Sequence, residues 1–168
     1  GSAISGRCGT AEASGGFDAA LWRGLAEQGA FSIRVPEAAG GLGLGLFDAV
    51  VLMEEAGRPL ASGPLGEALV AARLLATFGG NVDKLLVGEQ VVSLALHDIA
   101  TRSKQWIAGG TAAEAVIARR GDDVVVISVP ESARQGEATL AGNALAEIDL
   151  GALDAQVLAS GPDAVAAF

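Results

Sequence analysis

The sequence PEAAGGLGLGLFDAVVLMEEAGR, residues 36–58, joins a glycine cluster to an apolar segment and decides how the first half of the chain folds. Such a loop binds phosphate when a buried strand precedes it and a helix follows it, because backbone N–H groups then converge on the anion. Here only the short run 31–35 precedes it, Leu46 occupies the last glycine place of G-x-G-x-x-G, and no Lys-Ser/Thr pair follows. We therefore predict a tight connection between helices, with a phosphate loop as the alternative.

Composition excludes several classes of function. The 168 residues are 51% apolar, yet no apolar run approaches the roughly 18 residues that cross a bilayer, so no membrane span is expected. Twenty acidic against 11 basic residues give a net charge of −9, which disfavours nucleic-acid binding. The first residues lack the apolar core of a signal peptide, and a cytoplasmic location is expected.

Cysteine and histidine are too few for several kinds of site. Cys8 is the only cysteine, which excludes an internal disulfide and a thiolate metal cluster, and no metal site is predicted. A Ser-His-Asp triad would have to use His97, the only histidine, and the chain has no Gly-x-Ser-x-Gly elbow. Hydrolase chemistry is therefore not expected.

The first half has helical periodicity. Asp18 is placed to cap a helix that Gly29 ends, and Phe17 is placed to pack on Trp22 as a hydrophobic staple. A second helix is predicted over about 47–56, with one apolar stripe of Leu46, Val50 and Met53 and a second of Ala49, Leu52 and Ala56 beside it. A third begins near Ser62 and Pro64 and stops near Gly79, a short turn follows at 81–86, and a last helix begins in 161–168.

After Gly88 the period changes to that of strands. Short β-branched or alternating runs occupy 91–96, 115–119, 124–129 and 144–150. Helices before strands predict an α+β protein, with an N-terminal all-helical domain and then a small antiparallel β-barrel-like or sandwich domain. The expected division is a flexible tail over 1–16, a helical domain over 17–88, a β domain over 89–160 and the start of a C-terminal helix over 161–168.

Four stretches carry a resemblance to a known family. Residues 17–75 resemble the N-terminal helical domain of the acyl-CoA dehydrogenases, in which a Trp-containing helix leads to a Val-Pro-Glu, Gly-Gly-Leu-Gly loop and then to a Glu-Glu helix ending in Gly-Arg. LVGEQVVSLALHD, residues 86–98, resembles the entry into the family's middle β domain, and SKQWIAGGTAAEAVIAR, residues 103–119, resembles its Lys-x-Trp-Ile-Thr-Asn strand. Residues 151–168 resemble the exit into the C-terminal helical bundle.

The resemblance implies that FAD lies against the β domain. In the family, the Trp packs near the isoalloxazine, the Thr hydrogen-bonds it, and the end of the first β strand presents backbone and a Thr to the ring. These places are Trp106, Ala108, Leu96 and His97 here, so the four residues are the candidate cofactor-binding set. For Trp106 the alternative is a core or rim aromatic. For His97 the alternatives are a bond to a flavin carbonyl, a displaced proton carrier, or a cap on the strand end.

The chain also departs from the family pattern. LHDIATRS stands where the family has Thr-Glu-Pro and Gly-Ser-Asp, so the loop is either naturally short or lacks a segment between 100 and 101. Ala108 replaces the hydrogen-bonding Thr, a loss of about 0.5–1.5 kcal/mol. The family's catalytic glutamate lies on the C-terminal bundle, which is expected to be absent here. Glu54 and Glu55 point about 100° apart on a helix, so we assign no catalytic residue.

Three functions follow from these observations. The first is FAD-dependent α,β-desaturation of a fatty-acyl or steroid side-chain acyl-CoA thioester, with electrons passed to electron-transfer flavoprotein. In this case the chain is a fragment or subunit that lacks the catalytic base, and it works with an acyl-CoA dehydrogenase subunit in a homo- or hetero-oligomer. The second is a non-catalytic subunit of a hetero-oligomeric acyl-CoA dehydrogenase that does not bind FAD itself. The third is an unrelated helical-plus-β interaction domain. An exposed apolar patch and self-association are expected under the first two.

Overall fold

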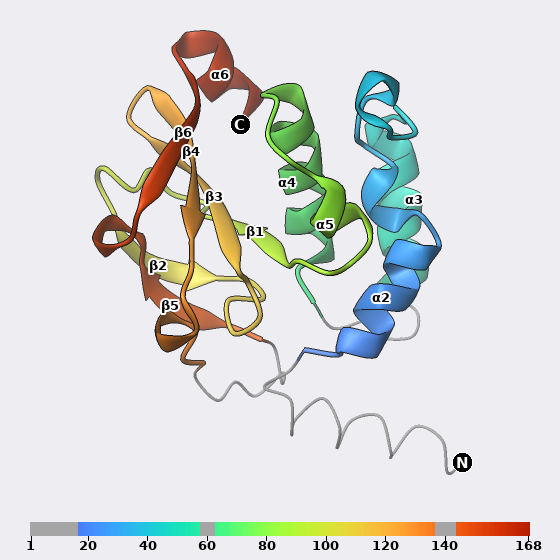
Figure 1. Cartoon of the computed structure of the whole chain (residues 1–168), viewed down its shortest axis with the longest axis horizontal. Coiled ribbons are helices and arrows are strands. Elements are labelled where there is room, and N and C mark those ends of the chain that lie inside the picture. The colour runs from blue at the N-terminus through green and yellow to red at the C-terminus, as the bar shows by residue number, and fades with distance from the viewer. Residues whose placement is uncertain (1–16, 58–62, 137–143) are drawn as a thin grey trace.

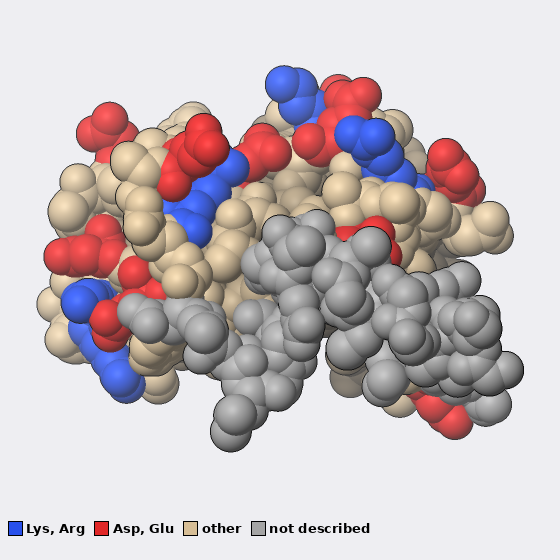
Figure 2. All heavy atoms as spheres, turned by 90° about the horizontal axis from the view of Figure 1, so that it is seen from below, with Lys and Arg blue, Asp and Glu red and all other residues tan. Residues whose placement is uncertain are grey.

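The structure is a computed structural model that describes residues 17–57, 63–136 and 144–168. The strands form one side of the molecule, α2 and α3 form the other, and α4 and α5 lie between them (Figure 1). Within the described ranges, every helix is too short or too polar to span a bilayer. Acidic and basic side chains are interleaved around the face seen in Figure 2. The predictions for Cys8 and Ser62 lie outside the described residues.

The first helix, α2 (Ala19–Glu27), forms where its capping signals predict it. The Asp18 carboxylate accepts the N–H groups of Ala20 and Leu21, both at 3.0 Å. The rings of Phe17 and Trp22 are 5.5 Å apart between centroids, so the predicted staple is confirmed.

The conformation of the glycine-rich connection before α3 explains why glycine is needed there. It follows two 3₁₀ turns, η1 (Ala30–Ser32) and η2 (Glu37–Ala39), and folds back on them. The N–H groups of residues 41–44 all donate to carbonyls of residues 32–36, at 2.8 to 3.1 Å. A Cβ at Gly41 would overlap the backbone of Val35. The loop uses these donors to close on its own chain, so the connection between helices is confirmed and the phosphate alternative is wrong.

Three further helices complete the helical part, namely α3 (Leu46–Gly57), α4 (Leu65–Thr77) and α5 (Asp83–Leu86). The central helix α4 buries most of its apolar side chains, Leu74 completely. The outer helix α3 buries Ala49 and Ala56, whereas the predicted stripe of Leu46, Val50 and Met53 is 70%, 53% and 46% exposed. Small residues therefore face the protein on α3 and large apolar residues face outward.

The strands form two sheets. The four-stranded sheet has the order β1 (Val92–Leu94), β3 (Ala115–Arg120), β4 (Asp123–Ser128), β6 (Ala155–Ser160). The two-stranded sheet pairs β2 (Lys104–Ile107) with β5 (Ala146–Asp149). Two 3₁₀ turns, η3 (Glu131–Ala133) and η4 (Leu150–Ala152), follow β4 and β5, and the helix α6 (Pro162–Ala167) follows β6.

The α+β class is confirmed, but two details of the β part need correction. The described strands form no closed barrel, because β1 and β2 lie in different sheets and share no ladder. The pairing of β1 with β3 is parallel, because the chain leaves the four-stranded sheet through β2 and returns to it in the same direction. The strand β6 was not predicted, since AQVLAS buries none of its residues fully and has no clear alternation.

The helical part and the β part share one hydrophobic cluster. It joins Trp22 of α2 and Leu74 of α4 to Val92 and Ile117 of the sheet. An Arg73 Nη atom on α4 also donates to the carbonyl oxygen of Ala167 in α6, at 2.6 Å. The division into domains at residues 88 and 160 remains a prediction.

Candidate functional site

The first side of the candidate site is the segment that leaves β1. It continues along β3, because the N–H groups of Ala95 and Ile99 donate to Ile117 and Arg119 carbonyls, both at 2.9 Å. Ala95 is fully buried, whereas the neighbouring Leu96 is 75% exposed. Alternation along an extended segment thus directs Leu96 outward at the end of the strand.

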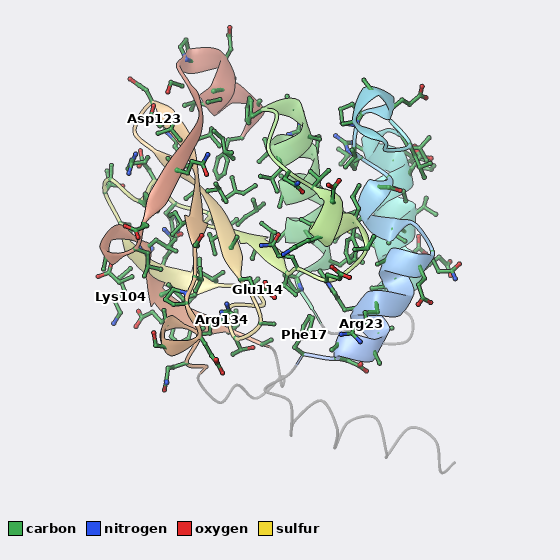
Figure 3. All side chains as sticks on the ribbon, in the orientation of Figure 1. Phe17, Arg23, Lys104, Glu114, Asp123 and Arg134 are labelled. Atoms are coloured by element: carbon green, nitrogen blue, oxygen red, sulfur yellow. The ribbon has the colours of Figure 1, made fainter. Side chains whose placement is uncertain are left out.

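The second side is β2. Gln105 and Ile107 are buried, whereas Lys104 and Trp106 are exposed, Trp106 to 47%. Lys104 projects from the side of the molecule opposite α2 (Figure 3) and forms an ion pair of 2.8 Å with Glu147, the residue of β5 that is paired with Trp106. The hydrogen bond with Glu147, and then its charge, raise the pKa of Lys104. The indole of Trp106 is therefore a surface ring beside a fixed ion pair.

Two buried polar side chains connect these sides. Ser93 Oγ on β1 donates to the carbonyl oxygen of Ala108, which follows β2, at 2.7 Å. The Gln105 amide accepts the N–H of His97 and donates to its carbonyl, both at 3.1 Å. The structure thus brings the backbone of His97 to Gln105 and that of Ala108 to Ser93, although the two strands belong to different sheets.

The loop between the two strands is closed by Asp98. Its Oδ1 accepts the N–H groups of Ala100 at 2.9 Å and of Gly121, in the β3–β4 turn, at 3.0 Å. Its Oδ2 lies 3.6 Å from Nε of Arg119. The N–H groups of Gly121 and Ala100, and then the charge of Arg119, hold the pKa of Asp98 below its usual range. This carboxylate is a structural anchor and a poor proton acceptor.

The loop leaves two backbone donors free at the site. The N–H groups of Leu96 and Asp98 have no hydrogen-bond partner among the residues that the structure describes. They flank His97, whose side chain is exposed. A ligand that carries acceptor atoms would meet these two donors beside the exposed side chain of Leu96. Ala108 adds only a methyl group there.

A pocket of about 490 Å³ lies elsewhere. Its lining includes Glu114, Ser128 and Arg134 and none of the four predicted residues. Glu114 and Ser128 border the beginning of β1, whereas Leu96 lies beyond its other end. Figure 3 shows Glu114 and Arg134 close together beneath the sheet. The candidate site is therefore an open surface, separate from this pocket.

Sequence reasoning missed three residues of the site, namely Ser93, Gln105 and Asp98 in its anchoring role. The signal for the first two was a polar residue within an apolar strand pattern, in VVSLAL and in KQWI.

Comparison with known proteins gives this surface a context. Residues 4–84 match the family model described as acyl-CoA dehydrogenase, N-terminal domain. The acyl-CoA dehydrogenase IpdE2 of Mycolicibacterium smegmatis is 34% identical over 113 residues, which are 64% of this chain and 33% of that protein. A variant of the Tcur3481–Tcur3483 steroid ACAD superposes with a TM-score of 0.66 and 28% identity over 89% of this chain and 50% of its own. Residues 4–84 belong to the acyl-CoA dehydrogenase N-terminal domain family.

Two further relatives agree with this assignment. IpdE2 of Mycobacterium tuberculosis is 46% identical over 63 residues, 36% of this chain and 20% of that protein. The ChsE4–ChsE5 complex of the same species has the same fold, with a TM-score of 0.64 at 21% identity over 90% of this chain and 50% of its own. The chain thus spans a third or less of the curated relatives and half of the solved chains.

Proposed function

We propose that this chain supplies one side of the flavin site of an acyl-CoA dehydrogenase that desaturates a fatty-acyl or steroid side-chain acyl-CoA thioester. The observation that carries the proposal is the junction of β1 and β2. Gln105 bonds to His97 there, their sequence neighbours Trp106 and Leu96 are exposed, and the N–H groups of Leu96 and Asp98 are free. The steroid side chain enters the proposal because a structural relative is named a steroid ACAD.

The residues at this junction would hold the ring of FAD. Trp106 and Leu96 would cover its apolar part, and the two free N–H groups would donate to its polar edge. When bound, FAD accepts a hydride from the substrate β-carbon as the α-proton leaves, and its electrons pass on to electron-transfer flavoprotein. His97 would present its backbone between the two donors, held by Gln105.

The proton acceptor for the acyl-CoA substrate would come from outside the described residues. Asp98 lies at the junction, but its lowered pKa makes it a weak base. Glu147 is paired with Lys104 at 2.8 Å. We infer that a further segment or a second acyl-CoA dehydrogenase subunit supplies this group.

The surface for such a subunit is the outer face of α3, which we define as Leu46, Phe47, Val50 and Val51. All four residues are 44% to 77% exposed. A patch of large apolar residues on one helix is typical of an interaction surface. The names of the two structural relatives, a Tcur3481–Tcur3483 enzyme and a ChsE4–ChsE5 complex, favour a hetero-oligomer.

Flavin binding tests the proposal. The purified chain, alone and mixed with an acyl-CoA dehydrogenase subunit, is titrated with FAD while the visible flavin spectrum is recorded. We expect binding, and we expect Trp106→Ala to weaken it about tenfold because the ring loses its aromatic neighbour. Val157→Ala is the matched control, since Val157 is 45% exposed on β6, at the other edge of the four-stranded sheet. Equal affinities of the Trp106 variant and the wild type would refute this site.

The alternative is a non-catalytic subunit that does not bind FAD itself. Ala108 favours it, because a methyl group gives the ring no hydrogen bond. Its distinguishing result is a stable complex with an acyl-CoA dehydrogenase subunit in which all the flavin is bound by that subunit and Trp106→Ala changes nothing.

A further inference from the structure

Ser93 and Gln105 are the fully buried polar side chains in the described part of the chain, at 0% and 2% exposure. They come from different sheets, Ser93 from β1 and Gln105 from β2. Burial of a hydroxyl and an amide is unfavourable unless both are hydrogen-bonded, so their partners show what they do.

Both side chains bond to backbone on the opposite strand or its loop. Ser93 reaches the carbonyl of Ala108 at 2.7 Å. Gln105 uses both ends of its amide on His97 and also donates to the carbonyl of Arg102 at 2.9 Å. An amide that donates to and accepts from one residue fixes that residue's orientation as well as its distance.

We propose that Ser93 and Gln105 are positioning residues that hold β1 and β2 at the spacing the planar ligand requires. The proposal rests on the proposed flavin site. Without a ladder between the strands, these side-chain bonds replace backbone pairing across the junction. They bond to Ala108 and His97, and His97 lies between Leu96 and Asp98 in the sequence, so they set the distance from the free N–H groups to β2.

Three variants and a control test this role. Gln105→Met keeps the length of the side chain and removes its bonds, Gln105→Glu keeps an acceptor and loses donors, and Ser93→Ala removes the hydroxyl. The control is Thr101→Val, because the Thr101 hydroxyl donates to Asp98 within the loop, at 2.9 Å, and does not reach β2. Each variant is measured for amide hydrogen exchange at His97 and for FAD affinity across pH.

We expect Gln105→Met to speed His97 amide exchange at least tenfold and to weaken FAD about tenfold, with a smaller effect of Ser93→Ala and none of Thr101→Val. Gln105→Glu gives the most specific signature. A protonated glutamate side chain donates to one of the two carbonyls that Gln105 reaches, those of His97 and Arg102, whereas a carboxylate repels both. FAD affinity should therefore be near that of the wild type at low pH and fall as the glutamate loses its proton.

The outcomes separate this proposal from the proposed function. If the wild type binds FAD and the Gln105 variants bind it equally at every pH, the positioning role is overturned. If the wild type does not bind FAD, alone or with a partner subunit, the proposed flavin site fails. His97 amide exchange then decides the positioning role by itself, because unchanged exchange in Gln105→Met would overturn it.

Discussion

Asp98→Ala should destabilise the chain because it removes one acceptor from two backbone donors. The N–H of Gly121 is partly buried in the β3–β4 turn, and the N–H of Ala100 is exposed. The Asp98 side chain is only 21% exposed, so water replaces it poorly at Gly121. The substitution therefore loosens the loop, which the Ile99 N–H still bonds to the Arg119 carbonyl of the hairpin.

The magnitude follows from these contacts. A hydrogen bond to a charged group contributes about 1.5–3 kcal/mol, and the exposed one at Ala100 contributes less because water replaces it. We expect a loss of about 2–3 kcal/mol for Asp98→Ala, which corresponds to about 4–12 °C in Tm for a chain of this size. Asp98→Asn keeps an acceptor oxygen and should lose about 1 kcal/mol. Urea unfolding gives these values, with Asp122→Asn, exposed on the same turn, as the control.

The pH dependence gives a second test. A carboxyl whose pKa is lowered by folding stabilises the protein above its unfolded pKa of about 3.9, and this contribution is lost as pH falls through the folded pKa. The difference in stability between wild type and Asp98→Asn should be complete above about pH 4 and shrink below it. A difference that is constant with pH, or an Asp98→Ala loss under about 0.5 kcal/mol, would refute the anchoring role.

Three further substitutions have clear expected results. Gly41→Ala should destabilise by about 3 kcal/mol or more in urea, because its Cβ overlaps Val35, whereas Gly40→Ala, which has space but a φ of 80°, should lose only about 1–2 kcal/mol. Ala108→Thr should tighten FAD binding about three- to tenfold by adding a donor, and Ala108→Val, of the same shape, should not. Val50→Asp should shift sedimentation toward the monomer. The free energy of unfolding should change by no more than about 0.5 kcal/mol, since Val50 is 53% exposed. Sedimentation equal to that of the wild type would exclude the outer face of α3 as an interface.

Local signals predicted the helices well. Asp18 caps α2 and Gly29 ends it through contacts within a few residues, and a reader of the sequence sees both partners at once. The glycine connection was also predicted, although its reason was not. The hydrogen bonds from residues 41–44 to residues 32–36 form because the chain folds back on itself, and the hydrophobic pattern of the sequence does not predict this reversal.

The site was harder to predict because its contacts cross between sheets. The resemblance located Leu96 and Trp106, but the partners of Ser93 and Gln105 depend on which strands pair. A polar residue within an apolar strand is usually predicted to be exposed. Here Ser93 and Gln105 are both buried. Because β1 and β2 share no ladder, backbone groups of Ala108 and His97 are left to be paired by these side chains.

The helix α3 shows why amphipathic pattern alone did not identify its buried side. Ala49 and Ala56 let its backbone approach the protein closely, while Phe47 and Val50 point outward on a helix that is apolar on both sides. A helix covered on one side only would lose stability or solubility from such an outer face, and polar residues there would do no harm to its inner packing. Large apolar residues on the outer face of α3 are therefore best explained by a second contact surface.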